Sequence, residues 1–148
     1  MKYISFMNDA ILQAQKAFDE GEVPVGCVIV RNGEIIAKAH NMCEKNKNAT
    51  HHAEILAIND AMDKTGEKYL TDCSLYVTLE PCPMCAGAII NSKIKRVYIG
   101  CADINYGCAE SVYRLLKDGV FNHTPEVYMG IEEERCSELL KRFFKERR

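Results

Sequence analysis

The chain has 148 residues, of which 47% are hydrophobic and 27% charged, and its formal net charge is −2 at pH 7. A length of about 100–200 residues is typical of one domain, so residues 1–148 are expected to fold as a single unit, which excludes disordered and fibrous proteins. Because the charge is slightly negative, no overall positive field attracts nucleic acid, and any RNA contact would be a local patch.

The N-terminal part of the chain predicts a helix followed by a β-hairpin. Apolar residues recur every three or four positions over residues 4–18, which indicates an amphipathic helix that ends at Gly21. Two apolar, β-branched runs follow, at 25–30 and 34–39. Asn32-Gly33 between them is the strongest short-range signal for a hairpin.

After a polar loop, the predicted elements alternate between helices and strands. Strands that alternate with helices indicate a sheet covered by helices on both faces, so the sequence predicts the α/β class. The expected spans are helices at 52–62, 83–91, 111–116 and 132–147, and strands at 74–79, 96–100 and 126–130.

The eight cysteines include Cys82 and Cys85, which form a C-x-x-C pair. No export signal is visible, and a chain of this length folds without disulfide bonds, so metal or redox chemistry is favoured over a disulfide framework. No apolar run approaches the roughly 20 residues that cross a bilayer. We therefore expect a cytoplasmic protein.

Two short segments carry metal-binding chemistry, His52-Ala53-Glu54 and Pro81–Cys85, and each stands at the predicted start of a helix. Together they offer one imidazole and two thiolates. Zinc takes four ligands of this kind, and three protein ligands leave one position for a water molecule, as in catalytic sites. A helix N-terminus also favours thiolate over thiol. The segments predict a catalytic zinc site formed by His52, Cys82 and Cys85.

Glu54 is the candidate catalytic residue. A carboxylate beside the metal can take a proton from water and pass it to a ring nitrogen and a leaving amine, which is general acid–base catalysis. The pattern H-x-E…P-C-x-x-C is the signature of the zinc deaminases, in which the Glu is not a ligand. A C-x-x-C pair alone would also fit a redox dithiol or half of a zinc ribbon, and His51 is an alternative ligand.

On these residues the sequence resembles the zinc-dependent cytidine/deoxycytidylate deaminase superfamily and, within it, the bacterial tRNA adenosine deaminases. The resemblance covers nearly the whole chain. Besides the two motifs, it rests on the segments Glu22–Gly26, His40-Asn41, Leu75–Cys82, Met84–Ala88, Phe121–His123 and Leu139–Phe144.

The resemblance implies a three-layer α-β-α fold with a mixed five-stranded sheet, a homodimer and one Zn²⁺ per subunit. It implies hydrolytic conversion of the wobble adenosine (position 34) of a tRNA anticodon stem-loop to inosine, with release of ammonia. It further implies that Asn41 binds the flipped purine, and that Asp103, Asn122, His123 and Phe144 lie along the RNA channel.

The chain departs from that family at two places. Asn48–His51 stands where the family usually has Asp-Pro-Thr-Ala, and Ile104–Tyr106 replaces a segment that commonly carries a lysine. The loss of a cation weakens phosphate binding, although the basic C-terminal helix partly restores it. Deamination of a free purine base or nucleoside, of the guanine or adenosine type, is therefore an alternative. A non-catalytic, zinc-stabilised RNA-binding module is a second one, against which Glu54 argues.

Overall fold

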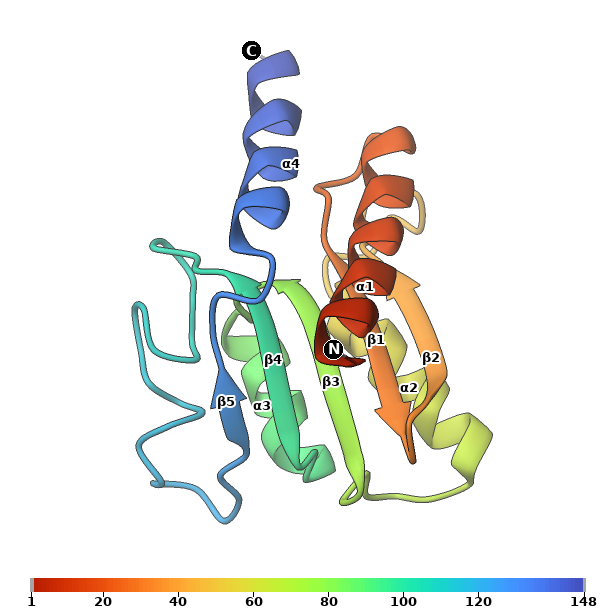
Figure 1. The fold of residues 1–148 in the computed structure, drawn as a ribbon, viewed down its shortest axis with the longest axis vertical. Helices are drawn as coiled ribbons and strands as arrows, with labels where there is room; N and C mark the ends of the chain where they lie inside the picture. The colour runs from red at the N-terminus through yellow and green to blue at the C-terminus, as the bar shows by residue number, and fades with distance from the viewer. Residues whose placement is uncertain (1, 148) are drawn as a thin grey trace.

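The computed structural model describes residues 2–147. Within them, no helix is both long enough and apolar enough to cross a membrane. In chain order the elements are α1 (Lys2–Asp19), β1 (Gly26–Arg31), β2 (Glu34–His40), α2 (Ala53–Thr65), β3 (Cys73–Leu79), α3 (Pro83–Ser92), β4 (Arg96–Cys101), β5 (Glu126–Tyr128) and α4 (Glu133–Glu146) (Figure 1).

The five strands form one mixed sheet in the order β2-β1-β3-β4-β5. β1 runs antiparallel to both of its neighbours, β2 and β3, whereas β3, β4 and β5 are parallel to one another. Parallel neighbours bring their carboxyl ends to the same edge, so the segments that follow β3 and β4 emerge side by side. That edge carries the candidate site.

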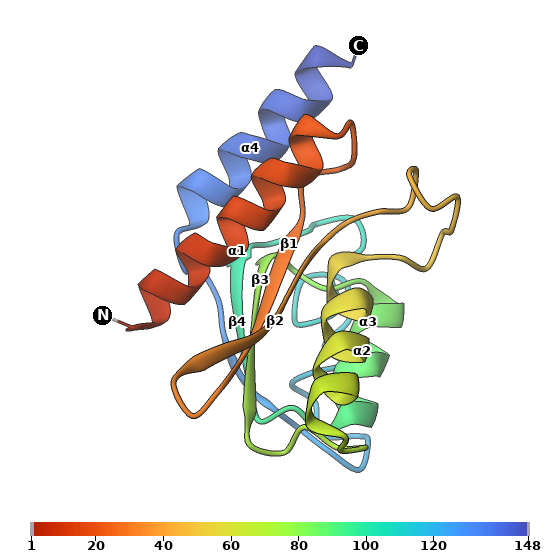
Figure 2. The same ribbon diagram turned by 90° about the vertical axis from the view of Figure 1, so that its right-hand side faces the viewer.

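Helices cover both faces of the sheet (Figure 2). α1 and α4 lie together on one face, and α2 and α3 lie on the other. Each face has its own buried apolar cluster, one containing Ile29, Leu75 and Ile99 under α2 and α3, the other containing Met7, Val28 and Tyr76 under α1 and α4. The predicted α/β class and the three-layer arrangement are confirmed.

The predicted hairpin is present, with Arg31 paired to Glu34 across a two-residue turn. Asn32 has a φ of 52° and Gly33 a φ of 77°. Positive φ at both central positions defines a type I′ turn, which matches the right-handed twist of the strands and is favoured by this dipeptide. The turn fixes which face of β1 and β2 is buried.

Three tyrosines form a stack across the sheet on the face covered by α1 and α4. Tyr76 of β3 is in register with Tyr98 of β4, and Tyr98 with Tyr128 of β5. The ring centroids lie 4.3 Å and 5.0 Å apart. These cross-strand pairs, which we call the tyrosine stack, pin the register of the three parallel strands.

The helix predicted at 111–116 is wrong. Residues 102–125 instead join β4 to β5 through a series of turns. The backbone N–H groups of Val112 and Tyr113 donate to the Gly107 carbonyl, five and six residues back, and that of Ser111 donates to the buried carboxylate of Glu80. Turns and the Glu80 carboxylate therefore hold residues 111–113 in a non-helical path.

Candidate active site

The candidate metal ligands lie at the N-termini of α2 and α3. His52 is the N-cap of α2, and Cys82 is the N-cap of α3; both have extended backbone dihedrals. Pro81 interrupts β3 pairing, and Pro83 occupies the first helical position, where its fixed φ favours helix initiation. Cys85 follows in the first turn of α3. The local sequence therefore determines where each donor atom stands.

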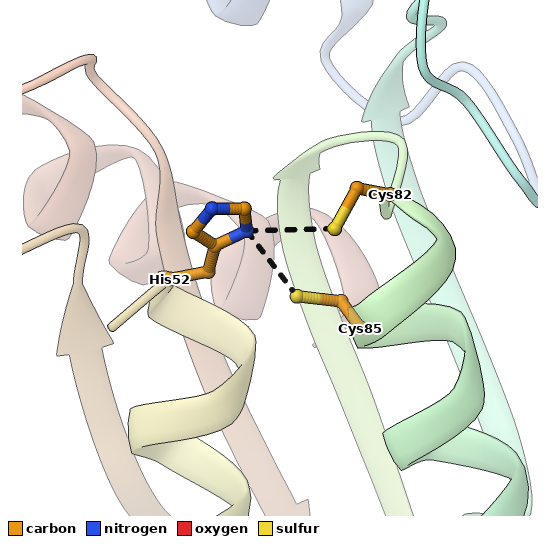
Figure 3. Close-up of side chains that lie close together, drawn as sticks. All are labelled: His52, Cys82 and Cys85. Carbon is orange, nitrogen blue, oxygen red and sulfur yellow. Dashed lines mark hydrogen bonds between the residues drawn. The ribbon is translucent and has the colours of Figure 1, made fainter. Parts of the chain in front are cut away.

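The three donor atoms converge on one point (Figure 3). The Nδ1 atom of His52 lies 3.5 Å from the sulfur of Cys82 and 3.6 Å from the sulfur of Cys85. All three atoms lie within 4.8 Å of one another. Bonds of about 2.0–2.3 Å to one ion at tetrahedral angles give separations of this size, so the donor set fits zinc.

The charges in this cluster depend on one another. Hydrogen bonds from the Cys85 thiol and from His52 outweigh burial and lower the pKa of Cys82 to about 4. The same contacts raise the pKa of Cys85, because that thiol donates to the Cys82 thiolate, and the hydrogen bond to Cys82 raises the pKa of His52. The cluster thus favours a thiolate at Cys82, and metal binding would release the remaining protons.

Glu54 faces the same pocket as His52. Two residues of one ideal helix would point about 200° apart, but His52 precedes the helix, so this constraint does not apply. The Glu54 side chain is 4% exposed. Burial raises the pKa of its carboxyl group to about 7, and the neighbouring Cys82 thiolate contributes to this rise. Near neutral pH the group can both accept and donate a proton.

The pocket in front of this cluster has a volume of about 290 Å³. Its apolar walls come from Val23, Val25 and Leu79, and Asn41 adds a buried amide. The Asn41 side chain is fixed on both sides, because its Nδ2 donates to the Val23 carbonyl and its Oδ1 accepts from the Cys43 N–H. The remaining lining residues are His52, Ala53, Glu54, Glu80, Cys82, Asp103 and Tyr106.

One side of the pocket rim is organised by Glu80, which the sequence analysis missed. Its carboxylate is 2% exposed and accepts hydrogen bonds from the N–H group of Asp103 and from those of three consecutive residues, 109–111. The Ser111 hydroxyl donates to it as well. Although burial opposes ionisation, these bonds lower the pKa of Glu80. Asp103 in turn accepts from the N–H of Tyr106.

The loop that follows Asn41 is held in a similar way by Glu22. This residue is 1% exposed, and its carboxylate accepts from the N–H groups of Glu44 and Lys45. The available signal was an acidic residue a few positions before an apolar strand, for Glu22, and directly after one, for Glu80. The pattern gives no partner, however, since the partners are backbone groups of remote loops.

The other predicted substrate-binding residues lie at different places. Phe144 is half exposed and lines a shallow groove with Lys141 and Ala102, next to Asp103. His123 donates to the Ile94 carbonyl before β4, at the opposite end of that strand, and neither it nor Asn122 lines the pocket. The alternative ligand His51 hydrogen-bonds Asn46 and lies outside the donor cluster.

Comparison with known proteins places this geometry in a family. The model of the cytidine and deoxycytidylate deaminase zinc-binding region matches residues 1–101. The chain is 47% identical to the tRNA-specific adenosine deaminase of Bacillus subtilis (strain 168), over 97% of this chain and 89% of that protein. A similar protein from Aquifex aeolicus (strain VF5), with the same name, is 46% identical over 97% of this chain and 94% of its own length.

Solved structures of related deaminases have the same fold as this chain. One from a study of A-to-I editing by tRNA A34 deaminases superposes with a TM-score of 0.89 at 40% identity, covering 92% of this chain and 99% of its own. The guanine deaminase of Bacillus subtilis superposes with a TM-score of 0.63 at 32% identity, covering 73% of this chain and 80% of its own. With its imidazole, two thiols and buried acid around one pocket, the chain belongs to the zinc-binding cytidine and deoxycytidylate deaminase family.

Proposed function

We propose that this protein is a hydrolytic deaminase that converts the wobble adenosine (position 34) of a tRNA anticodon stem-loop to inosine. The observation that carries the proposal is the donor cluster that opens into a pocket containing Glu54 and Asn41, in a chain 47% identical to a tRNA-specific adenosine deaminase over nearly its full length. Water enters the reaction and ammonia leaves, so no other co-reactant is needed.

His52, Cys82 and Cys85 would hold one zinc ion and leave one coordination position facing the pocket. When bound, zinc lowers the pKa of water from 15.7 to about 7 and so supplies a nucleophile at neutral pH. The helix N-termini that carry His52 and Cys82 contribute positive ends of helix dipoles, which stabilise thiolate.

Glu54 would move the protons. Its carboxylate accepts one proton from the attacking water and passes it to the purine ring nitrogen. It then takes the second proton from the new hydroxyl group on the purine carbon and passes it to the amine, which leaves as ammonia. A pKa of about 7 suits both directions of transfer, and burial at 4% exposure is its main cause. Transfers of this kind typically contribute roughly 10²- to 10⁴-fold to the rate.

The pocket suits a single nucleobase. Its volume of about 290 Å³ is at the lower limit of the range of roughly 300–1,000 Å³ found for ligand sites. Val23, Val25 and Leu79 offer apolar contacts to the faces of a ring, and Asn41 offers an amide to its edge. An adenosine would enter flipped out of its strand, as enzymes that act on bases require.

The rest of the stem-loop would lie outside the pocket. Asp103 stands at its mouth, and the groove beside it presents the ring of Phe144 with the cations Lys141 and Lys145. These residues supply stacking and local positive charge where the net charge of the chain supplies none. Asn122 and His123 would meet RNA only at a second region of the surface, near the start of β4.

The proposal includes a homodimer in the cytoplasm, each subunit acting through one domain and one zinc ion. Large apolar side chains are exposed after the pocket rim, at Val112, Tyr113, Val120 and Phe121. A contiguous patch of exposed apolar side chains is typical of a surface that contacts another protein, and these four belong to one connection, between β4 and β5. Sedimentation equilibrium would test the dimer, and a monomer at micromolar concentration would contradict it.

The deciding experiment is inosine formation by the zinc-loaded protein on an anticodon stem-loop with adenosine at position 34, run beside free adenosine, guanine and cytidine. Turnover confined to the stem-loop is the expected result. Turnover of a free base or nucleoside alone would contradict the proposal and assign the site to small-molecule metabolism, as in the related guanine deaminase. Zinc binding without any turnover would indicate a binding module.

A further inference from the structure

Tyr106 is an exposed aromatic residue at the mouth of the pocket. Its side chain is 68% exposed, yet it lines the pocket together with Asn41 and Glu54. Other exposed aromatic side chains of the same connection, Tyr113 and Phe121, do not line it. The position of Tyr106 is therefore not explained by the general exposure of residues 102–125.

The backbone that carries Tyr106 is fixed from two sides. The Tyr106 N–H donates to the Asp103 Oδ1 at 3.1 Å, and the Asp103 N–H donates to Glu80 at 3.0 Å. Beyond Tyr106, the Gly107 N–H donates to the Asp103 carbonyl. A ring presented from an ordered backbone loses little conformational freedom when a ligand packs against it, which favours binding.

The ligand that fits this position is a nucleobase. The pocket has room for one base, so on a polynucleotide substrate the neighbouring nucleotide must lie at the mouth. The face of an aromatic ring stacks on any base, largely regardless of its sequence. We infer that Tyr106 is a specificity-determining residue that stacks on the base adjacent to the deaminated adenosine, an inference that rests on the proposed function.

Stacking on Tyr106 would favour a polynucleotide over a free nucleoside, because only a polynucleotide has an adjacent base. Removing the ring should weaken binding of the stem-loop by about 10-fold, within the range measured for base–aromatic stacks. Chemistry at the target base should change little, since Glu54 and the donor cluster keep their positions. The expected signature is a raised KM with a nearly unchanged kcat.

The test combines Tyr106→Ala and Tyr106→Phe with stem-loops in which the base at position 33 or 35 is replaced by an abasic site. If Tyr106 stacks on one of these bases, removing that base should raise the KM of the wild type about 10-fold. It should not change the KM of Tyr106→Ala, because the base and the ring form one contact that is already lost in this variant. Tyr106→Phe should behave like the wild type. If the abasic site raises KM by the same factor for the wild type and for Tyr106→Ala, at position 33 and also at position 35, the inference is overturned.

Tyr69→Ala is the matched control. Tyr69 is also exposed, but it follows the C-terminal end of α2, while the pocket lies at the N-terminal end. A fall in stem-loop affinity as large in Tyr69→Ala as in Tyr106→Ala would overturn the inference.

The double-mutant cycle of Tyr106→Ala and the abasic stem-loops is also measured by binding. Fluorescence anisotropy gives the dissociation constant of each stem-loop, with Glu54→Ala present in every protein so that no turnover occurs. If the wild type deaminates no stem-loop, the proposed function fails, while this binding cycle still decides whether Tyr106 contacts an adjacent base. An additive binding cycle would overturn the inference even where turnover of the stem-loop is observed.

Discussion

Gly107 lies against the buried carboxylate of Glu80, so closely that a Cβ atom at position 107 would stand 2.4 Å from the Glu80 Cδ. The same atom would lie 2.4 Å from the Asp103 carbonyl oxygen. Real Cβ atoms do not approach this closely, so the rim segment closes around Glu80 only because residue 107 has no side chain. Four predictions follow from this rim and from the donor cluster behind it.

The first concerns Gly107→Ala. The added methyl group must displace either the Glu80 carboxylate or the rim backbone, and overpacking of this kind costs roughly 1–3 kcal/mol of unfolding free energy. We expect lower stability and a lower kcat/KM with an unchanged zinc content. Chemical denaturation and metal analysis check this. Gly87→Ala is the control: a Cβ there meets no atom within 4 Å, so the change should be neutral or stabilising. Equal effects of both substitutions would contradict the account.

The second concerns Glu80→Gln. A glutamine places an NH₂ group where the carboxylate accepts backbone N–H donors, so at least one buried donor loses its partner. Hydrogen bonds to charged groups contribute roughly 1.5–3 kcal/mol each, and we expect the unfolding free energy to fall by about 2–4 kcal/mol. Glu138→Gln, at an exposed position of α4, should change it by less than about 0.5 kcal/mol. Urea denaturation of both variants decides.

The third concerns Glu54→Ala. Loss of the proton carrier should lower kcat by roughly 10²- to 10⁴-fold, whereas zinc content and folding should be retained, because Glu54 is outside the donor cluster. Asp63→Ala, an exposed acid on the same helix, should leave both kcat and zinc unchanged. Loss of zinc from Glu54→Ala would show that this carboxylate is a ligand and would refute its assigned role.

The fourth concerns the metal. Cys85→Ala, or treatment with a chelator, should reduce zinc from one ion per subunit to none and abolish turnover, because two protein ligands do not retain the ion. Cys136→Ala, at a buried cysteine on the inner face of α4, should keep its zinc. The metal-free protein should stay folded, since the apolar clusters on both faces of the sheet form without the ion. Global unfolding on chelation would contradict this.

Local patterns predicted most of the fold. The Asn32-Gly33 turn, the strand ended by Pro81 and the helix begun by Pro83 each depend on residues next to one another. Such reasoning fails at 111–116, where the predicted helix is absent and the carboxylate of Glu80, remote in the chain, binds the backbone N–H of Ser111 instead.

The site also divides into residues that local sequence predicts and residues that depend on contacts remote in the chain. His52, Cys82 and Cys85 were visible as motifs, because their spacing and their places at helix starts are encoded locally. Glu22 and Glu80 were not, because each holds backbone groups of a loop that is remote in the chain. Tyr106 was noted as a departure from the family, but only the folded rim brings it to the pocket.

The tyrosine stack offers a consequence of a different kind. The chain has seven tyrosines and no tryptophan, so its near-ultraviolet absorption and intrinsic fluorescence come mainly from tyrosine. Tyr98 stacks against Tyr76 and against Tyr128, on the face of the sheet away from α2 and α3. Coupling between the stacked rings should give a near-ultraviolet circular dichroism band that reports whether β3, β4 and β5 are correctly paired. The band therefore reports the folding of the sheet independently of metal binding.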